Sequence, residues 1–204
     1  MIIAIDGPSG AGKSTVARAL GESGARVLDA DRMGHEITDG VPEVRSALAQ
    51  EYGADVYRPD GTLDRRRVAA KVFADPAALT RLNLLVHPRI LARLRAAIAE
   101  AAREGFTGAL VVDAALLLDW GFERECDAVM AVIAPVSLQI ERLVAARGWS
   151  GAEARQRLER ARSNQEFADL ADEVIVNDGS EAAAAAAARA ALARLFARRA
   201  GGAA

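Results

Sequence analysis

The residues best suited to chemistry lie in one short stretch near the beginning of the chain, residues 7–15, which read GPSGAGKST. This stretch fits the spacing G-x-x-x-x-G-K-[ST], in which glycines let backbone N–H groups approach a polyphosphate closely. Lys13 is expected to reach the β- and γ-phosphates, and the Ser14 hydroxyl is expected to bind Mg²⁺. The alternative is a glycine-rich turn that binds nothing, and the residues on either side argue against it.

The flanking residues predict the elements that such a loop requires. Residues 2–5 (IIAI) form an apolar run that is typical of a buried parallel strand, and residues 15–20 place apolar side chains at helical spacing. A strand, a glycine-rich turn and a helix aim successive N–H groups and the positive end of the helix at one anion. The sequence therefore predicts the phosphate-binding loop, or P-loop, of an NTPase.

Carboxylates follow two further predicted strands. Residues 25–28 are expected to form the second strand, which ends in a loop containing Asp29 and Asp31, and residues 109–113 the third, which ends at Asp113. Ligands of open α/β sheets bind beyond the carboxyl ends of the strands. One acid of the 29/31 pair is expected to accept a proton from an acceptor hydroxyl, with helix capping as the alternative, and Asp113 is expected to hold Mg²⁺.

Strands and helices alternate along most of the chain. Residues 127–133 and 173–177 complete a set of five predicted strands, and residues 181–199 form a closing helix before residues 201–204, which are expected to fray. We therefore predict an α/β fold with a five-stranded parallel sheet between two helical layers, in a single domain spanning residues 1–204.

Residues 34–105 interrupt that alternation with helical patterns alone. Candidate helices cover residues 41–51, 63–73, 77–86 and 90–103, with a break at His87 and Pro88. This is too much helix for one crossover, and we predict an insertion that binds the phosphate acceptor. Arg65 and the next two arginines could contact an anionic acceptor, with a solvated charged face as the alternative.

A second helical region is expected to close over the nucleotide. A helix beginning after Pro135 carries Arg142, residues 148–150 break it, and residues 152–167 form an arginine-rich helix. We interpret residues 147–167 as a lid.

The composition describes a globular protein without unusual features. The net charge of −2 argues against a nucleic-acid surface, and Cys126 is the only cysteine, which favours a reducing compartment. Neither a secretory signal nor a membrane-spanning run is evident, so we expect a cytoplasmic protein that binds neither nucleic acid nor membrane. The sequence leaves its oligomeric state open.

Several motifs, in order, resemble those of the dephospho-CoA kinase family, up to about residue 180. They are GKSTVA at residues 12–17, LDAD at 28–31, DGTLDR at 60–65, RLNLLVHP at 81–88, LLLD at 116–119, QIERL at 139–143 and ADEVIVN at 171–177. The resemblance implies a P-loop kinase of coenzyme A biosynthesis that uses ATP to phosphorylate the ribose 3′-hydroxyl of dephospho-CoA.

The resemblance also implies roles for individual residues. Asp31 would be the general base and Arg142 would lie near the transferring phosphate, while Arg65 and His87 become candidate acceptor contacts. The ATP phosphates would lie on Gly10, Ala11, Gly12, Lys13, Ser14 and Thr15. From its pattern alone, a histidine before proline at a helix start is more typical of a capped or packed position than of catalysis.

The chain departs from the family at several positions. Its loop reads GPSGAGKS where the family usually has GGxGSGKS, and in this it is closer to cytidylate or uridine kinases. Ala115 replaces a usual proline, Asp119 a glutamate, and Ala161 a lid glutamine. A nucleoside or nucleotide kinase is therefore the alternative function.

Overall fold

The computed structural model describes residues 1–201, including all side chains except those of Phe73, Ala74 and Pro76. The chain divides into two compact units. The first combines Met1–Leu28 with Glu104–Ala204, and the second is Asp29–Arg103. The expectation that the chain's end frays falls mainly on residues 202–204, which lie outside the described residues.

The strands form one sheet, as predicted. They are β1 (Ile2–Asp6), β2 (Arg26–Asp29), β3 (Leu110–Asp113), β4 (Ala128–Ile133) and β5 (Glu173–Val176). Their order is β2-β3-β1-β4-β5, so β1 lies at the centre between parallel neighbours β3 and β4. The five-stranded parallel sheet with helices on both sides is confirmed.

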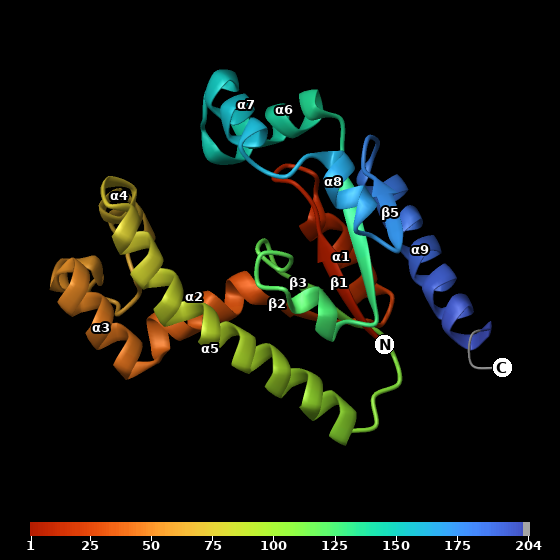
Figure 1. The fold of residues 1–204 in the computed structure, drawn as a ribbon, viewed down its shortest axis with the longest axis horizontal. Coiled ribbons are helices and arrows are strands. Elements are labelled where there is room, and N and C mark those ends of the chain that lie inside the picture. Colours follow the sequence, from red (N-terminus) through yellow and green to blue (C-terminus); the bar gives the residue numbers. More distant parts are fainter. Residues whose placement is uncertain (202–204) are drawn as a thin grey trace. The chain divides into compact units, whose positions relative to one another are not determined.

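The core of the first unit explains why these segments become strands. Ile3 and Ile5 of β1 point to one face of the sheet, where they pack with Val16 and Leu20 of the helix α1 (Lys13–Glu22). The helix α9 (Glu181–Gly201) covers the same face beside β5 (Figure 1). Burying both faces of the inner strands β1, β3 and β4 requires the near-continuous apolar sequence that they have, whereas β2 is mostly exposed.

The region predicted as a single lid helix contains two helices, which corrects the expected helix over residues 152–167. The first unit continues through η2 (Phe122–Glu125), α6 (Val136–Arg147), α7 (Gly151–Glu159) and α8 (Asn164–Asp169). The first helix ends at Glu159 with Arg160 as its C-cap, and Ser163 begins the second, because its hydroxyl accepts from Glu166 N–H while Glu166 accepts from Ser163 N–H. This capping box satisfies two backbone donors that a continuous helix would have paired internally.

The second unit is helical among its described residues, apart from one isolated bridge between Tyr57 and Leu63. Its elements are α2 (Ala30–Gly40), α3 (Pro42–Tyr52), η1 (Ala54–Val56), α4 (Arg65–Ala74) and α5 (Pro76–Arg103). Figure 1 shows α5 as the long helix on which α2 packs.

The predicted break at His87 and Pro88 is wrong, because α5 continues through both residues. Val86, Ile90 and Leu94 are all buried and lie four residues apart, so one apolar face runs past the proline. The carbonyl that Pro88 leaves without its helical donor belongs to Leu84, whose side chain is 69% exposed, so water can reach this part of the helix. Packing along the buried face offsets the roughly 3 kcal/mol that an internal proline costs.

Candidate active site

The P-loop connects β1 to α1 through glycines that no other residue could replace without strain. Gly10 has a φ of 77° and Gly12 a φ of 92°, both in the left-handed region. A Cβ at Gly10 would lie 2.7 Å from the Gln139 carbonyl oxygen, and one at Gly12 would lie 2.1 Å from Asn177 Nδ2. Residues of the same unit therefore pack closely against the loop at both glycines, and they fix its shape.

Lys13, the first residue of α1, lies against the beginning of the loop. Its Nζ donates to the carbonyl oxygens of Gly7 at 2.6 Å and Pro8 at 3.3 Å. The N-terminal N–H groups of α1 and this ammonium therefore flank the same loop. A helix N-terminus with a lysine beside it attracts phosphate through both its partial and its full positive charge.

Two side chains from later in the chain hold the loop. Arg142 of α6 donates through Nη1 to the carbonyl oxygens of Gly10 and Ala11, each at 3.2 Å. Asn177, 4% exposed after β5, donates through Nδ2 to Ala11 O at 2.8 Å, and its own carbonyl accepts from Arg142 Nη2. The structure thus brings Arg142 to residues 10–15. Sequence analysis assigned Asn177 no role, although a polar residue directly after an apolar strand was the available signal.

The two candidate Mg²⁺ ligands also belong to this unit. Ser14 follows Lys13 in the first turn of α1, and Asp113 ends β3 in register with Ile5 of β1. Asp113 shares a strand face with Val111, which packs in the same core cluster as Val16 of α1. Residues 1–201 contain no group of three or more His, Cys, Asp or Glu arranged for a metal. One hydroxyl and one carboxylate suit Mg²⁺, which keeps several waters and binds substrate phosphates.

Sequence analysis also missed Asp6, the last residue of β1. Asp6 is 2% exposed, and its carboxylate accepts from Gly7 N–H at 2.7 Å and from Leu118 N–H at 3.3 Å. Burial raises the pKa of Asp6 to about 6, against the opposing influence of these N–H groups and of Lys13. The signal was a charged residue that ends an apolar strand directly before the loop.

The second unit holds Asp31, and its local structure differs from the expected loop. Helix α2 begins at Ala30, immediately after β2, so Asp31 lies in the first helical turn. Asp29 is the N-cap, because its Oδ1 accepts from Arg32 N–H at 2.9 Å. Helix capping therefore belongs to Asp29, and the carboxylate of Asp31 is exposed.

Arg65, at the start of α4, is held by α2. Its Nη2 donates to Asp39 Oδ2 at 3.0 Å and to Thr38 Oγ1 at 3.2 Å. Burial alone would raise the pKa of Asp39, but Leu63 N–H and the Arg65 guanidinium hold it below its usual value. The predicted anion contact thus has an acidic partner within its own unit.

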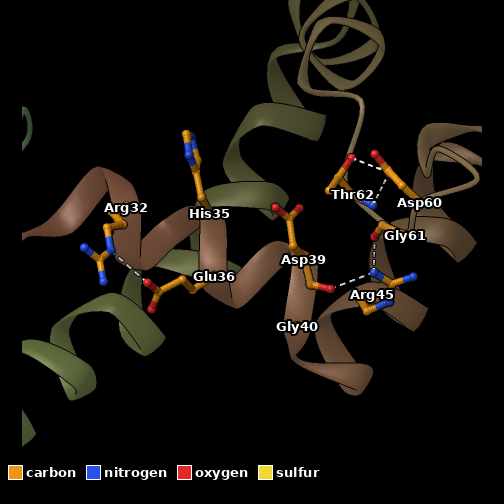
Figure 2. A pocket seen from close by; sticks show the side chains of 9 residues that line it. All are labelled: Arg32, His35, Glu36, Asp39, Gly40, Arg45, Asp60, Gly61 and Thr62. Atoms are coloured by element: carbon orange, nitrogen blue, oxygen red, sulfur yellow. Dashed lines mark hydrogen bonds and ion pairs between the residues drawn. The ribbon is translucent and has the colours of Figure 1, made fainter.

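A pocket of about 530 Å³, lined mostly by charged and polar residues, lies beside this pair (Figure 2). Side chains from α2 and from the 60–62 turn point toward it, and Arg45 bridges the two by donating to the carbonyls of Asp39 and Gly61. Its lining residues are Arg32, His35, Glu36, Asp39, Gly40, Arg45, Asp60, Gly61 and Thr62. The turn belongs to the DGTLDR motif, where Asp60 Oδ1 accepts from both the N–H and the hydroxyl of Thr62.

His87 lies in the middle of α5 and does not start a helix. It is partly buried, and burial lowers its pKa, which favours the neutral imidazole at neutral pH. His87 is not among the residues that line the pocket in Figure 2. The structure therefore gathers the predicted ATP contacts in the first unit and Asp31, Arg65 and His87 in the second.

A parallel sheet with a lysine- and hydroxyl-bearing P-loop at the carboxyl end of its central strand defines a P-loop kinase. The solved structure titled TT1252 from Thermus thermophilus is 31% identical, with a TM-score of 0.76 over 96% of this chain and 97% of that one. A dephospho-CoA kinase from Campylobacter jejuni, 22% identical, has the same fold, with a TM-score of 0.70 over 93% of this chain and 94% of that one.

The comparison of sequences gives the family. Residues 1–183 match the model of the dephospho-CoA kinase family. The chain is 38% identical over 180 residues to a dephospho-CoA kinase of Thermobifida fusca, covering 88% of each chain. It is 41% identical over 193 residues to one of Deinococcus radiodurans, covering 95% of this chain and 91% of that one. The chain belongs to the dephospho-CoA kinase family and is an ATP-dependent phosphotransferase. No helix among its described residues is long and apolar enough to cross a membrane.

Proposed function

We propose that this enzyme transfers the γ-phosphate of ATP to the ribose 3′-hydroxyl of dephospho-CoA and so produces coenzyme A. The observation that carries the proposal is a fully formed P-loop in a chain of this family, with Lys13 beginning helix α1. Phosphoryl transfer depends mainly on positioning and on stabilising charge, and a loop of fixed shape provides both.

The ATP phosphates occupy the loop formed by residues 10–15. The Lys13 ammonium has three N–H donors, so it keeps its 2.6 Å bond to the Gly7 carbonyl and exchanges the 3.3 Å bond to Pro8 for the more strongly charged phosphate oxygens. Arg142 already reaches this loop through two bonds of 3.2 Å to neutral carbonyls. Its planar guanidinium is suited to an anion, so it stabilises the negative charge on the transferring phosphate.

Ser14 and Asp113 would hold Mg²⁺ beside the loop. Held by these two residues, the ion would supply positive charge that offsets the negative charge of the phosphates. The sequence positions of the two ligands are those that such a site needs: a hydroxyl in the first turn after the P-loop and a carboxylate at the end of the neighbouring strand.

Asp31 is the general base of the proposed reaction. Its carboxylate orients the ribose 3′-hydroxyl and accepts its proton as the oxygen attacks the γ-phosphate. Two features of the structure support this role: Asp29 already serves as the N-cap of α2, and Asp31 is exposed in the first turn.

The second unit recognises the acceptor. The pocket in Figure 2 is lined by side chains of both charges, which suits the polar groups of a nucleotide. Arg65 bonds to Asp39, one of the residues that line this pocket. The neutral imidazole of His87 can donate or accept a hydrogen bond.

A coupled ATP-consumption assay tests the acceptor. Purified enzyme is supplied with ATP and, separately, with dephospho-CoA, CMP, uridine or no acceptor. We expect turnover with dephospho-CoA, at least a hundredfold above the other three, because a site that hydrogen-bonds its substrate strongly rejects analogues that leave its polar groups unpaired. Turnover with CMP or uridine alone would show that the loop's likeness to nucleotide and nucleoside kinases extends to the substrate.

A further inference from the structure

Asp6 is a buried carboxylate that the proposed mechanism does not use. It ends the central strand β1 at 2% exposure, one residue before the P-loop begins. A charge in such a place costs stability unless it is paired, and natural chains retain costly charges mainly at functional sites.

The contacts of Asp6 connect two segments that are far apart in the sequence. Oδ1 accepts from Gly7 N–H at 2.7 Å, and Oδ2 accepts from Leu118 N–H at 3.3 Å. Gly7 in turn offers its carbonyl oxygen to Lys13 Nζ at 2.6 Å. One carboxylate therefore bonds the N–H of the residue whose carbonyl holds the P-loop lysine and, at the same time, the segment that follows β3.

Gly7 cannot compensate by moving. Its φ is 153°, and a Cβ there would lie 2.1 Å from the Val132 carbonyl oxygen, so the backbone of β4 presses on it directly. Gly7 is thus held on one side by β4 and, through its N–H, on the other by Asp6. A displaced Gly7 would shift the carbonyl that positions Lys13.

The segment beyond Leu118 carries the contact further. Asp119 pairs with Arg162 at 2.8 Å, and Arg162 lies between α7 and α8 in the predicted lid. Lys13 and Asp119 are the charged groups that act on the Asp6 carboxylate, one attractive and one repulsive. Asp6 thus connects Lys13, through Gly7, with the segment containing Leu118 and Asp119, which contacts the predicted lid through Arg162.

We propose that Asp6 is a positioning residue of the phosphate site: by accepting from Gly7 and Leu118 it holds Lys13 in place for ATP and couples the P-loop to the segment after β3. This inference rests on the proposed binding of ATP at residues 10–15. Asp6 itself contacts no substrate in this proposal. Its substitution should therefore weaken ATP binding and catalysis but leave acceptor binding unchanged.

The first experiment compares Asp6→Asn with Asp127→Asn. Asp127 is a matched control, because its Oδ2 accepts from Ile2 N–H at 2.7 Å at the opposite end of the same strand. Asp6→Asn keeps the shape but replaces one accepting oxygen by a donor. We expect kcat to fall about 10–100-fold and the KM for ATP to rise, with the acceptor KM within about twofold, because small misplacements in a catalytic site cost this much. The control should stay within about twofold throughout.

The second experiment needs no variant. Amide hydrogen exchange is measured on the wild-type enzyme with and without a non-hydrolysable ATP analogue. Exchange at Leu118 N–H should slow together with exchange at Gly7, since the Asp6 carboxylate joins them. Unchanged exchange at Leu118, or normal ATP kinetics in a folded Asp6→Asn variant, would overturn the inference. If Lys13→Ala also bound ATP normally, the proposed function itself would be wrong, which distinguishes the two failures.

Discussion

The two compact units hold their functional groups in different ways. The proposed phosphate site of the first unit is made largely of backbone, with glycine conformations fixed by contacts to Gln139 and Asn177 and with Arg142 bonded to loop carbonyls. The proposed acceptor residues of the second unit are side chains that pair with one another, as Arg65 does with Asp39 and Arg32 with Glu36.

This difference indicates how each unit recognises its ligand. A backbone site is complete before the ligand arrives and costs little reorganisation, which suits a phosphate common to many substrates. A site of paired charges must exchange internal partners for the ligand, which makes binding sensitive to which polar groups the ligand presents. We expect catalytic loss from damage to the first unit and from loss of the base, and loss of acceptor affinity from damage to the rest of the second.

The largest effect is expected at Asp31, the one residue of the second unit to which we assign a chemical step. Asp31→Asn preserves shape but removes basicity, so kcat should fall by about 10²–10⁴ while ATP binding stays close to normal. Steady-state kinetics and calorimetric titration with an ATP analogue measure the two quantities.

Asp29→Asn is the matched control for this prediction, since asparagine caps a helix as well as aspartate does. It should retain near wild-type kcat. A large loss in Asp29→Asn, with full activity in Asp31→Asn, would transfer the base to Asp29, and full activity in both would remove general-base catalysis from this site.

Lys13→Ala should be the next most damaging change. It removes the positive charge of the first residue of α1, which is expected to bind the ATP phosphates. Losing one charged contact to the transition state costs about 3–4 kcal/mol, or a rate loss of 10²–10³, with the fold retained. The control is the other lysine of the chain, Lys71, which pairs with Asp55 at 3.6 Å in the second unit. Near-normal turnover of a folded Lys13→Ala variant would show that ATP binds elsewhere.

The buried charge of Asp6 predicts a pH dependence of stability. Its folded-state pKa of about 6 lies above the ordinary 3.8, so between these values the folded chain binds more protons than the unfolded chain. Asp6 therefore lowers the free energy of unfolding as pH rises from about 4 to 6, by on the order of 3 kcal/mol in total at neutral pH.

Denaturant unfolding of wild type and Asp6→Asn at pH 4, 5, 6 and 7 measures this effect. The stability of the variant relative to wild type should increase across the range, whatever constant offset the lost hydrogen bond contributes. A difference that does not change with pH would mean that Asp6 titrates alike in the folded and unfolded chain.

The smallest effect is expected at Arg65. Arg65→Ala should raise the acceptor KM about tenfold and leave the ATP KM within about twofold, because ground-state binding lost at one contact shows in that substrate's KM. Arg103→Ala is the control, since its guanidinium is exposed at the end of α5 and pairs only with Glu100 of the same helix among the ion pairs of the described residues. Equal changes in both KM values would mean that Arg65 stabilises the second unit in general and does not bind the acceptor specifically.

The local parts of this protein were predictable from its sequence. The strand–loop–helix around residues 7–15 follows from short-range rules, because glycine spacing, an apolar strand and a helical pattern are all encoded within twenty residues. All five strands were likewise predicted, and for the inner strands β1, β3 and β4 the reason is that burial on both faces leaves continuous apolar runs. The motif order also predicted the family, which the comparisons confirm.

Predictions from local sequence patterns were wrong where tertiary packing or a side-chain hydrogen bond decided the local structure. Pro88 predicted a break, but the buried face of Val86, Ile90 and Leu94 carries α5 through it. The helical pattern over residues 152–167 concealed the capping box at Ser163. Position alone did not separate Asp29 from Asp31, and the choice of Asp31 as the base came from the family resemblance; the helix start at Ala30 assigns the cap to Asp29.

The sequence by itself determined the phosphate loop, the parallel sheet and the family, because each is encoded by neighbouring residues or by a period along the chain. Only the tertiary structure decided that Asn177 and Arg142 enclose the loop and that Asp6 joins Gly7 to Leu118. These contacts connect residues more than 100 positions apart in the chain. No local pattern records such a contact, because it exists only once the strands have taken their order in the sheet.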